Sequence, residues 1–141
     1  MIILIIIFLS SLTIYTHTQI LWLTAEMARA LKKLPPRTVI VLIVLVLLFV
    51  HLLEIVIWAG GFYGTYHWFG LGGFVGNADY TLKSFFYYSS VTYTTLGAGD
   101  ITPLPDFEVL TGIEALIGLM MITWSASFAY LSMQKFWPSH Y

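Results

Sequence analysis

The stretch TYTTLGAGDITP, residues 92–103, places two glycines around an alanine and ends them with an aspartate, in a chain that carries very little charge. Of the 141 residues, 59% are hydrophobic and only 9% are charged, whereas about a quarter of the residues of an ordinary soluble domain are charged. So few charges cannot cover a surface that faces water. The composition therefore predicts a membrane protein, with this glycine-containing stretch set among apolar helices.

Three segments are long enough to cross the apolar core of a bilayer, which takes about 20 residues of helix. They cover approximately residues 1–25, 38–59 and 107–131. The first is interrupted by polar residues at 17–19, but it lacks the positively charged start of a secretory signal, so we expect an uncleaved helix. The predicted fold class is an all-α membrane protein with three transmembrane helices.

The distribution of cations predicts the orientation of these helices. Four of the six Lys and Arg residues lie in the connection between the first and second helices, namely Arg29, Lys32, Lys33 and Arg37. Short connections rich in Lys and Arg stay in the cytoplasm. We therefore expect a multi-pass protein of the cell membrane, in contact with lipid, with its N-terminus outside and its C-terminus in the cytoplasm. The net charge of -1 excludes a broad basic face for nucleic acid.

The connection between the second and third helices, residues 60–105, is too long and too unusual for a plain loop. Its first part, residues 60–80, holds seven of the eleven glycines, and we expect irregular backbone there. Residues 81–94 contain neither Gly nor Pro and predict a short helix, whose N-cap is one of three polar residues: Asn77, Asp79 or Thr81. Non-helical backbone at membrane depth is tolerated only where protein or water surrounds it. A short helix followed by Gly-containing backbone therefore predicts a re-entrant loop that lines a pore.

Residues 89–103, SSVTYTTLGAGDITP, resemble the pore loop of the tetrameric potassium channel family, whose selectivity filter typically reads Thr-Val-Gly-Tyr-Gly-Asp. The residues in register with that filter are Thr95, Leu96, Gly97, Ala98, Gly99 and Asp100. The resemblance covers about residues 52–131 and leaves out the first helix. It implies a homotetramer in which each subunit supplies one filter strand, with Asp100 at the outer mouth.

The resemblance also implies that main-chain oxygens of Thr95, Leu96, Gly97 and Ala98 bind potassium or sodium ions. Backbone oxygens suit this task because they replace the water around a cation without adding net charge, as in potassium channels. Glycine at positions 97 and 99 permits backbone angles that other residues avoid. We expect no cofactor besides the bound monovalent cations. We also expect no enzyme activity, because the sequence shows no nucleotide loop, nucleophile triad or pair of catalytic acids.

Ala98 departs from the family, which usually has tyrosine at this position. In the family that ring bonds to pore-helix residues of a neighbouring subunit and holds the filter open, and the matching positions here are Tyr88 and Thr92. A methyl group in its place leaves a void that neighbouring side chains, water or collapse must fill. We expect aromatic rings of the short helix to fill some of this space, since it carries Phe85, Phe86, Tyr87, Tyr88 and Tyr93. Three interpretations stay open: a potassium channel, a weakly selective sodium and potassium channel, and a non-conducting membrane subunit.

Several polar groups are predicted to support the filter. We expect Tyr87 to bond to Asp100 behind the loop. Glu54 and Glu114 lie within the second and third helices, and we expect both to be buried and bonded to the pore helix, because an unpaired buried carboxyl is costly. His17, on the first helix, is expected to bond to another helix.

Gly118 matches the position of the gating hinge in the inner helix of the family, and close helix packing is the alternative interpretation, since small residues are common where membrane helices meet. No helix carries Arg at every third position, so a voltage sensor of the usual kind is not expected. We predict two parts of the chain: an N-terminal helix with its cytoplasmic linker, residues 1–34, and an ion channel pore domain, residues 35–141.

Overall fold

A computed structural model of the chain describes residues 1–31, 33–76 and 78–136. The described residues form four helices and two short strands, in the order α1 (Ile2–Ala30), α2 (Pro36–Phe69), β1 (Phe74–Gly76), α3 (Leu82–Tyr93), β2 (Ile101–Pro103) and α4 (Pro105–Phe136). The helices α1, α2 and α4 are each long and apolar enough to cross a membrane. The predicted fold class, an all-α membrane protein with three transmembrane helices, is confirmed.

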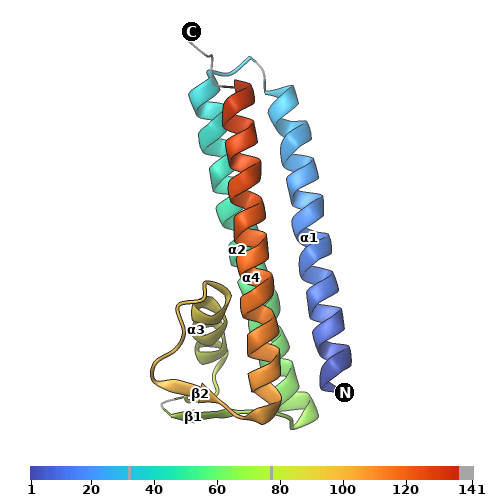
Figure 1. Cartoon of the computed structure of the whole chain (residues 1–141), viewed down its shortest axis with the longest axis vertical. Coiled ribbons are helices and arrows are strands. Elements are labelled where there is room, and N and C mark those ends of the chain that lie inside the picture. Colours follow the sequence, from blue (N-terminus) through green and yellow to red (C-terminus); the bar gives the residue numbers. More distant parts are fainter. Residues whose placement is uncertain (32, 77, 137–141) are drawn as a thin grey trace.

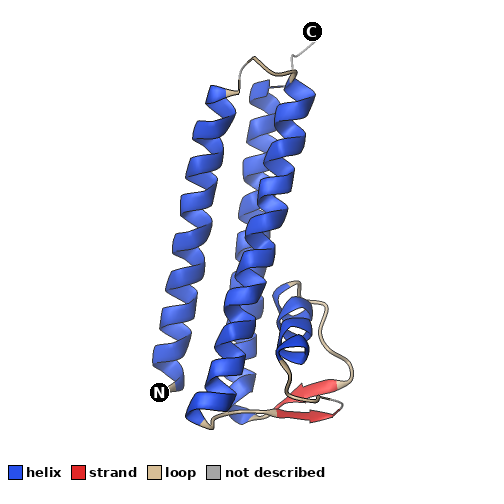
Figure 2. Ribbon diagram, turned by 180° about the vertical axis from the view of Figure 1, so that it is seen from behind, coloured by secondary structure: helices blue, strands red, loops and turns tan. Residues whose placement is uncertain are grey.

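The three long helices run side by side, and the short helix α3 packs against one half of α2 and α4 (Figure 1). Seen from behind, α1 lies on the side of α2 and α4 that faces away from α3 (Figure 2). Since α1 packs against both α2 and α4, it is part of the same bundle. The division of the chain at residue 34 stays a prediction.

Helix α2 extends ten residues further than the sequence pattern indicates. Residues 60–69 were expected to be irregular, but they continue the helix, which ends at Gly70 with a left-handed φ of 63°. The physical reason is packing: a Cβ at Gly61 would lie 2.4 Å from a Leu9 methyl carbon of α1, and Phe62 is completely buried. The glycine at position 61 therefore marks a close helix approach rather than a loop.

The two strands form a small antiparallel pair that the sequence did not predict. Gly76 of β1 lies opposite Ile101 of β2, which ties the chain before α3 to the chain after the glycine-containing loop. Gly76 has a φ of 115°, and a Cβ there would lie 2.1 Å from the Asp100 main-chain oxygen. Glycine is required at this position by both the backbone angle and the close approach.

Helix α3 is held by a capped start and by an aromatic core. Of the three candidate caps, Thr81 is the N-cap, and its side chain accepts a hydrogen bond from the Ser84 N–H. The Asp79 carboxylate accepts from the Thr81 and Ser84 hydroxyls, whereas Asn77 lies outside the described residues. The core around α3 consists mainly of large buried side chains from α2, α3 and α4, including Trp58, Phe62, Phe85, Phe107 and Leu110.

Candidate ion pore and its supports

The predicted filter loop, residues 95–100, begins where α3 ends. The Thr95 N–H donates to the Thr92 oxygen at 2.9 Å, and the Gly97 N–H donates to the Val91 oxygen at 3.0 Å. These two bonds turn the chain out of the helix and fix the start of the loop. Gly97 has a left-handed φ of 77°, and Thr95 has a φ of 60°. Gly99 does not have a positive φ, so of the two glycines only Gly97 uses the expected freedom.

The main-chain oxygens of the loop are available for a ligand. Within the described residues, the oxygens of Thr95, Leu96, Gly97 and Ala98 accept no hydrogen bond from the rest of the chain. The Leu96 side chain is 80% exposed, although it is large and apolar. These oxygens are therefore open to partners from outside the described chain.

A pocket of about 310 Å³ lies beside Ala98. Its walls include Tyr88 and Thr92 of α3 and Thr111 of α4. The Tyr88 hydroxyl bonds to the Thr111 hydroxyl at 2.8 Å. The two predicted support residues, Tyr88 and Thr92, therefore do lie beside Ala98, but Tyr88 is bonded to α4 and the space beside Ala98 stays open.

A buried polar cluster lies at the C-terminal end of α3. We call it the Glu54 cluster, and its members are His17, His51, Glu54 and Tyr93. His17 Nδ1 lies 2.9 Å from Glu54 Oε1, His51 Nδ1 lies 3.2 Å from Glu54 Oε2, and the Tyr93 hydroxyl donates to Glu54 Oε2. Glu54 and His17 are completely buried. As expected from the sequence, Glu54 bonds to the pore helix and His17 bonds to another helix.

Glu114 meets the pore helix one turn earlier. It is completely buried, and Ser89 Oγ of α3 lies 2.5 Å from Glu114 Oε1. The same serine oxygen lies 2.9 Å from the Ile55 main-chain oxygen. A hydroxyl has a single hydrogen to donate, so both contacts are satisfied together when Ser89 donates to Ile55 and accepts from a protonated Glu114 carboxyl. The expectation that Glu114 bonds to the pore helix agrees with this geometry.

Gly118 lies at a direct contact between α4 and the end of α3. A Cβ added to Gly118 would lie 2.2 Å from the Tyr93 main-chain oxygen and 3.0 Å from its ring. The structure therefore shows close packing at this glycine, which was one of the two interpretations, and the hinge role stays a prediction.

The structure does not bring Tyr87 and Asp100 together. Both side chains are exposed, and no hydrogen bond among the described residues joins them. Tyr87 lies on the face of α3 that is open in a single subunit, next to the exposed Phe86, whereas the buried face carries Tyr88 and Ser89. The predicted contact is thus not formed within one chain.

Two residues of the site, Thr111 and Tyr93, were missed by reasoning from the sequence. The signal for Thr111 is its spacing of three and seven residues from Glu114 and Gly118, which places all three on one face of α4, and all three contact α3. Tyr93 was noted only as an aromatic residue, although its place at the end of the short helix brings it to Glu54.

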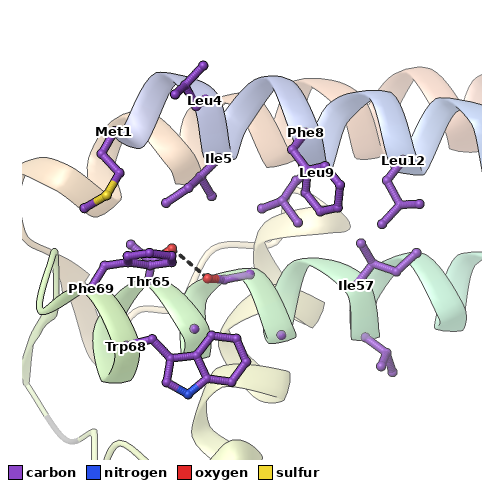
Figure 3. A pocket seen from close by; sticks show the side chains of 14 residues that line it. Met1, Leu4, Ile5, Phe8, Leu9, Leu12, Ile57, Thr65, Trp68 and Phe69 are labelled. Atoms are coloured by element: carbon purple, nitrogen blue, oxygen red, sulfur yellow. Dashed lines mark hydrogen bonds between the residues drawn. The ribbon is translucent and has the colours of Figure 1, made fainter.

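An apolar groove of about 600 Å³ lies away from the loop, between α1 and α2. Figure 3 shows side chains of α1 such as Leu9 facing side chains of α2 such as Ile57, with Trp68 at the rim. A wall of this kind offers no ligands to an ion, so the candidate ion site is the loop and not this groove.

Comparison with protein families matches residues 38–134 to a family described as ion channel. The match covers well over half of the chain and includes nearly all of α2, the whole of α3 and its loop, and most of α4, while α1 lies outside it. Neither the curated proteins nor the solved structures gave a match. With this match and these three membrane-sized helices, the chain belongs to the ion channel family.

Proposed function

We propose that this chain is the pore-forming subunit of a homotetrameric channel that conducts potassium ions passively through a filter of main-chain oxygens. The observation that carries the proposal is the set of four consecutive oxygens, from Thr95 to Ala98, that accept no hydrogen bond within the described chain. They follow a short helix packed between two membrane-sized helices. A cation that sheds its water requires a ring of such oxygens.

One loop supplies one side of a ring, so several subunits must meet around an axis. The apolar side chains left open on one subunit support this step. Leu96 on the loop and Leu82 and Phe86 on α3 are exposed, yet a re-entrant helix is surrounded by protein rather than lipid. Neighbouring subunits would cover these side chains, and the potassium channel resemblance implies four subunits.

The α1 helix would lie at the lipid-facing edge of this assembly, because it packs on the side of the bundle away from α3 (Figure 2). The apolar groove between α1 and α2 is suited to the acyl chains of membrane lipids, since its lining is formed almost entirely by apolar side chains. Lipid is thus the proposed partner at this edge.

The proposed orientation follows from the two ends of the bundle. The N-terminus lies at the end that carries β1 and β2, while the α1–α2 connection and the end of α4 lie at the other (Figure 1). That second end holds Arg29, Lys33, Arg37 and Lys135, and Lys32 lies outside the described residues. Because cations mark the cytoplasmic side, we place the N-terminus outside and the C-terminus in the cytoplasm.

A weakly selective sodium and potassium channel is the second candidate, and the pocket beside Ala98 favours it. A filter that lacks packing on one side can change its diameter more easily than a filter that is packed on every side. The non-conducting subunit has no observation in its favour, but the same experiment tests it.

The test is potassium efflux from liposomes that contain the purified protein, compared with empty liposomes. The proposal expects the protein to dissipate a potassium gradient, and native mass spectrometry in the same preparation should find four copies per particle. A gradient that persists would contradict conduction. A particle of one or two copies would contradict the ring.

A further inference from the structure

The Glu54 cluster gathers side chains that bind metals, at a place that the proposed filter does not use for conduction. His17 Nδ1, His51 Nδ1 and a Glu54 carboxylate oxygen all lie within 4.8 Å of one another. Two helices supply them, α1 and α2. We propose that these three side chains form a binding site for a transition-metal dication of the zinc class.

The spacing of the three ligand atoms suits a small tetrahedral ion. With bonds of about 2.0–2.1 Å, such an ion holds its ligands roughly 3.3 Å apart. His17 Nδ1 lies 2.9 Å from Glu54 Oε1, and His51 Nδ1 lies 3.2 Å from the other carboxylate oxygen, Oε2. One ligand atom from each of the three residues lies within 4.8 Å of the others, so shifts of roughly 1.5 Å at most would bring them to the spacing of a tetrahedral site.

The kinds of ligand select the class of metal. Two imidazoles with one carboxylate favour zinc and its neighbours, whereas calcium and magnesium prefer oxygen ligands alone. Three protein ligands leave a fourth position open. The Tyr93 hydroxyl lies 3.1 Å from His51 Nδ1, so it stands beside that position, where its own oxygen or a water completes the coordination.

The surroundings of the site support a bound cation. His17 and Glu54 are completely buried among three long apolar helices, where an isolated carboxylate is costly and a dication compensates its charge. The far nitrogen of His17, Nε2, lies 3.5 Å from the Ser125 hydroxyl of α4, a contact that orients the ring. The His51 side chain is 17% exposed, which leaves one side of the site open for entry.

The site would give α1 a role in the pore domain. His17 comes from α1, which lies outside the region matched to the ion channel family, and Tyr93 is the last residue of α3. A metal ion at Glu54 would hold α1, α2 and the end of the pore helix together, immediately before the filter loop begins.

The test uses the full-length protein purified without a histidine tag, stripped of metal and titrated with Zn²⁺, with bound metal measured by elemental analysis. We expect one ion per subunit. Co²⁺ should give the strong visible absorption of a four-coordinate site. The variant H17Q/H51Q should bind Zn²⁺ more than about 100-fold more weakly, since loss of a ligand exceeds the roughly 10–100-fold effect of losing an outer partner.

The matched control is H67Q/H140Q, which removes the other two histidines of the chain and should keep the wild-type stoichiometry. His67 contacts the Tyr80 oxygen, away from the cluster. No binding by the wild-type protein, or equal loss in both variants, would overturn the proposal. If H17Q/H51Q does not fold, the variant E54Q provides the test through thermal unfolding with and without Zn²⁺. The proposal requires that Zn²⁺ raises the unfolding temperature of the wild type but not that of E54Q. The readout is bound metal, so a failure leaves the conduction proposal standing.

Discussion

The two ends of the filter loop are supported in opposite ways. At the end that follows α3, the chain is held by contact and by polar bonds: Tyr93 packs directly on Gly118, and its hydroxyl donates to the buried Glu54. Toward β2, Ala98 borders a pocket of about 310 Å³ that also reaches Thr92 and Thr95, and the phenol that lines it, Tyr88, is bonded to α4 instead.

This difference separates two properties of a pore. In the proposed channel, the positions of the main-chain oxygens depend on the backbone, which the contacts of Tyr93 hold in place. The diameter of the proposed ring depends on packing from all sides, and the pocket beside Ala98 leaves one side less packed. Conduction should therefore depend on the packed end, and ion selectivity on the open end.

Replacing Gly118 by alanine should have the largest effect. The new Cβ would lie 2.2 Å from the Tyr93 oxygen, so the end of α3 must move, and overpacking of this kind costs about 1–3 kcal/mol or more. We expect potassium efflux from liposomes to fall by about tenfold or more. Gly112→Ala is the matched control on the same helix, because a Cβ there meets nothing within 4 Å. Equal efflux in the two variants would show that the packed end does not control conduction.

Removing the Tyr93 hydroxyl should weaken the attachment of the end of α3 while the ring stays packed against Gly118. Tyr93→Phe keeps the ring and loses one bond to Glu54, while His17 and His51 remain beside the carboxylate. The net loss of one hydrogen bond costs about 0.5–1.5 kcal/mol. The thermal unfolding midpoint in detergent should fall accordingly. Tyr15→Phe, at an exposed position of α1, should leave it unchanged. If the Tyr93→Phe protein were as stable as the wild type, the bond between Tyr93 and Glu54 would not help to hold the end of α3.

Filling the pocket should change ion selectivity. In Ala98→Tyr the ring can enter the pocket and pack against the loop. A difference of about 1 kcal/mol between the two ions, the size of one hydrogen bond, corresponds to a rise of several-fold in the potassium-over-sodium permeability ratio. The reversal potential under opposed potassium and sodium solutions measures this ratio. Ala98→Phe supplies the ring without the hydroxyl and separates packing from bonding. A ratio unchanged in both variants would contradict the role given to the pocket.

The smallest expected effect concerns the start of α3. Hydrogen bonds from Ser84 and Thr81 lower the pKa of the exposed Asp79 carboxyl. The folded protein therefore favours the charged form, and the stability that this gives is present at neutral pH and is lost as the pH falls through the lowered pKa. Asp79→Asn should slightly lower the unfolding midpoint at pH 7 and reduce its loss in acid. Asp106→Asn removes the same charge as a control. If the unfolding midpoint fell equally with pH in the wild type and in Asp79→Asn, the charged Asp79 carboxylate would not contribute to stability.

The helices could be predicted from the sequence because their signals are local. Runs of apolar residues define α1, α2 and α4, and α3 begins after Thr81, one of the three candidate N-caps. The extension of α2 through residues 60–69 could not be predicted in the same way, because glycine suits both a loop and a close helix contact. Only the position of Leu9 against Gly61 decides between the two.

The part of the candidate site that consists of consecutive residues could be predicted from the sequence. The loop and its departure at Ala98 follow from the order of residues 95–100, but the aromatic rings of α3 were expected to fill the space beside Ala98, where the structure has a pocket. The Glu54 cluster joins residues 37 and 39 positions apart. The burial of Glu54 was expected, but no local pattern specifies which distant histidine and tyrosine meet it.

The central claim is that main-chain oxygens of Thr95 to Ala98 surround a dehydrated cation on an axis shared by four subunits. The most direct measurement is the anomalous scattering of Rb⁺, a heavy substitute for potassium, in crystals of the assembled protein. Our account predicts peaks on a fourfold axis, bracketed by these oxygens. A loop without such peaks, or with its oxygens turned from the axis, would contradict it.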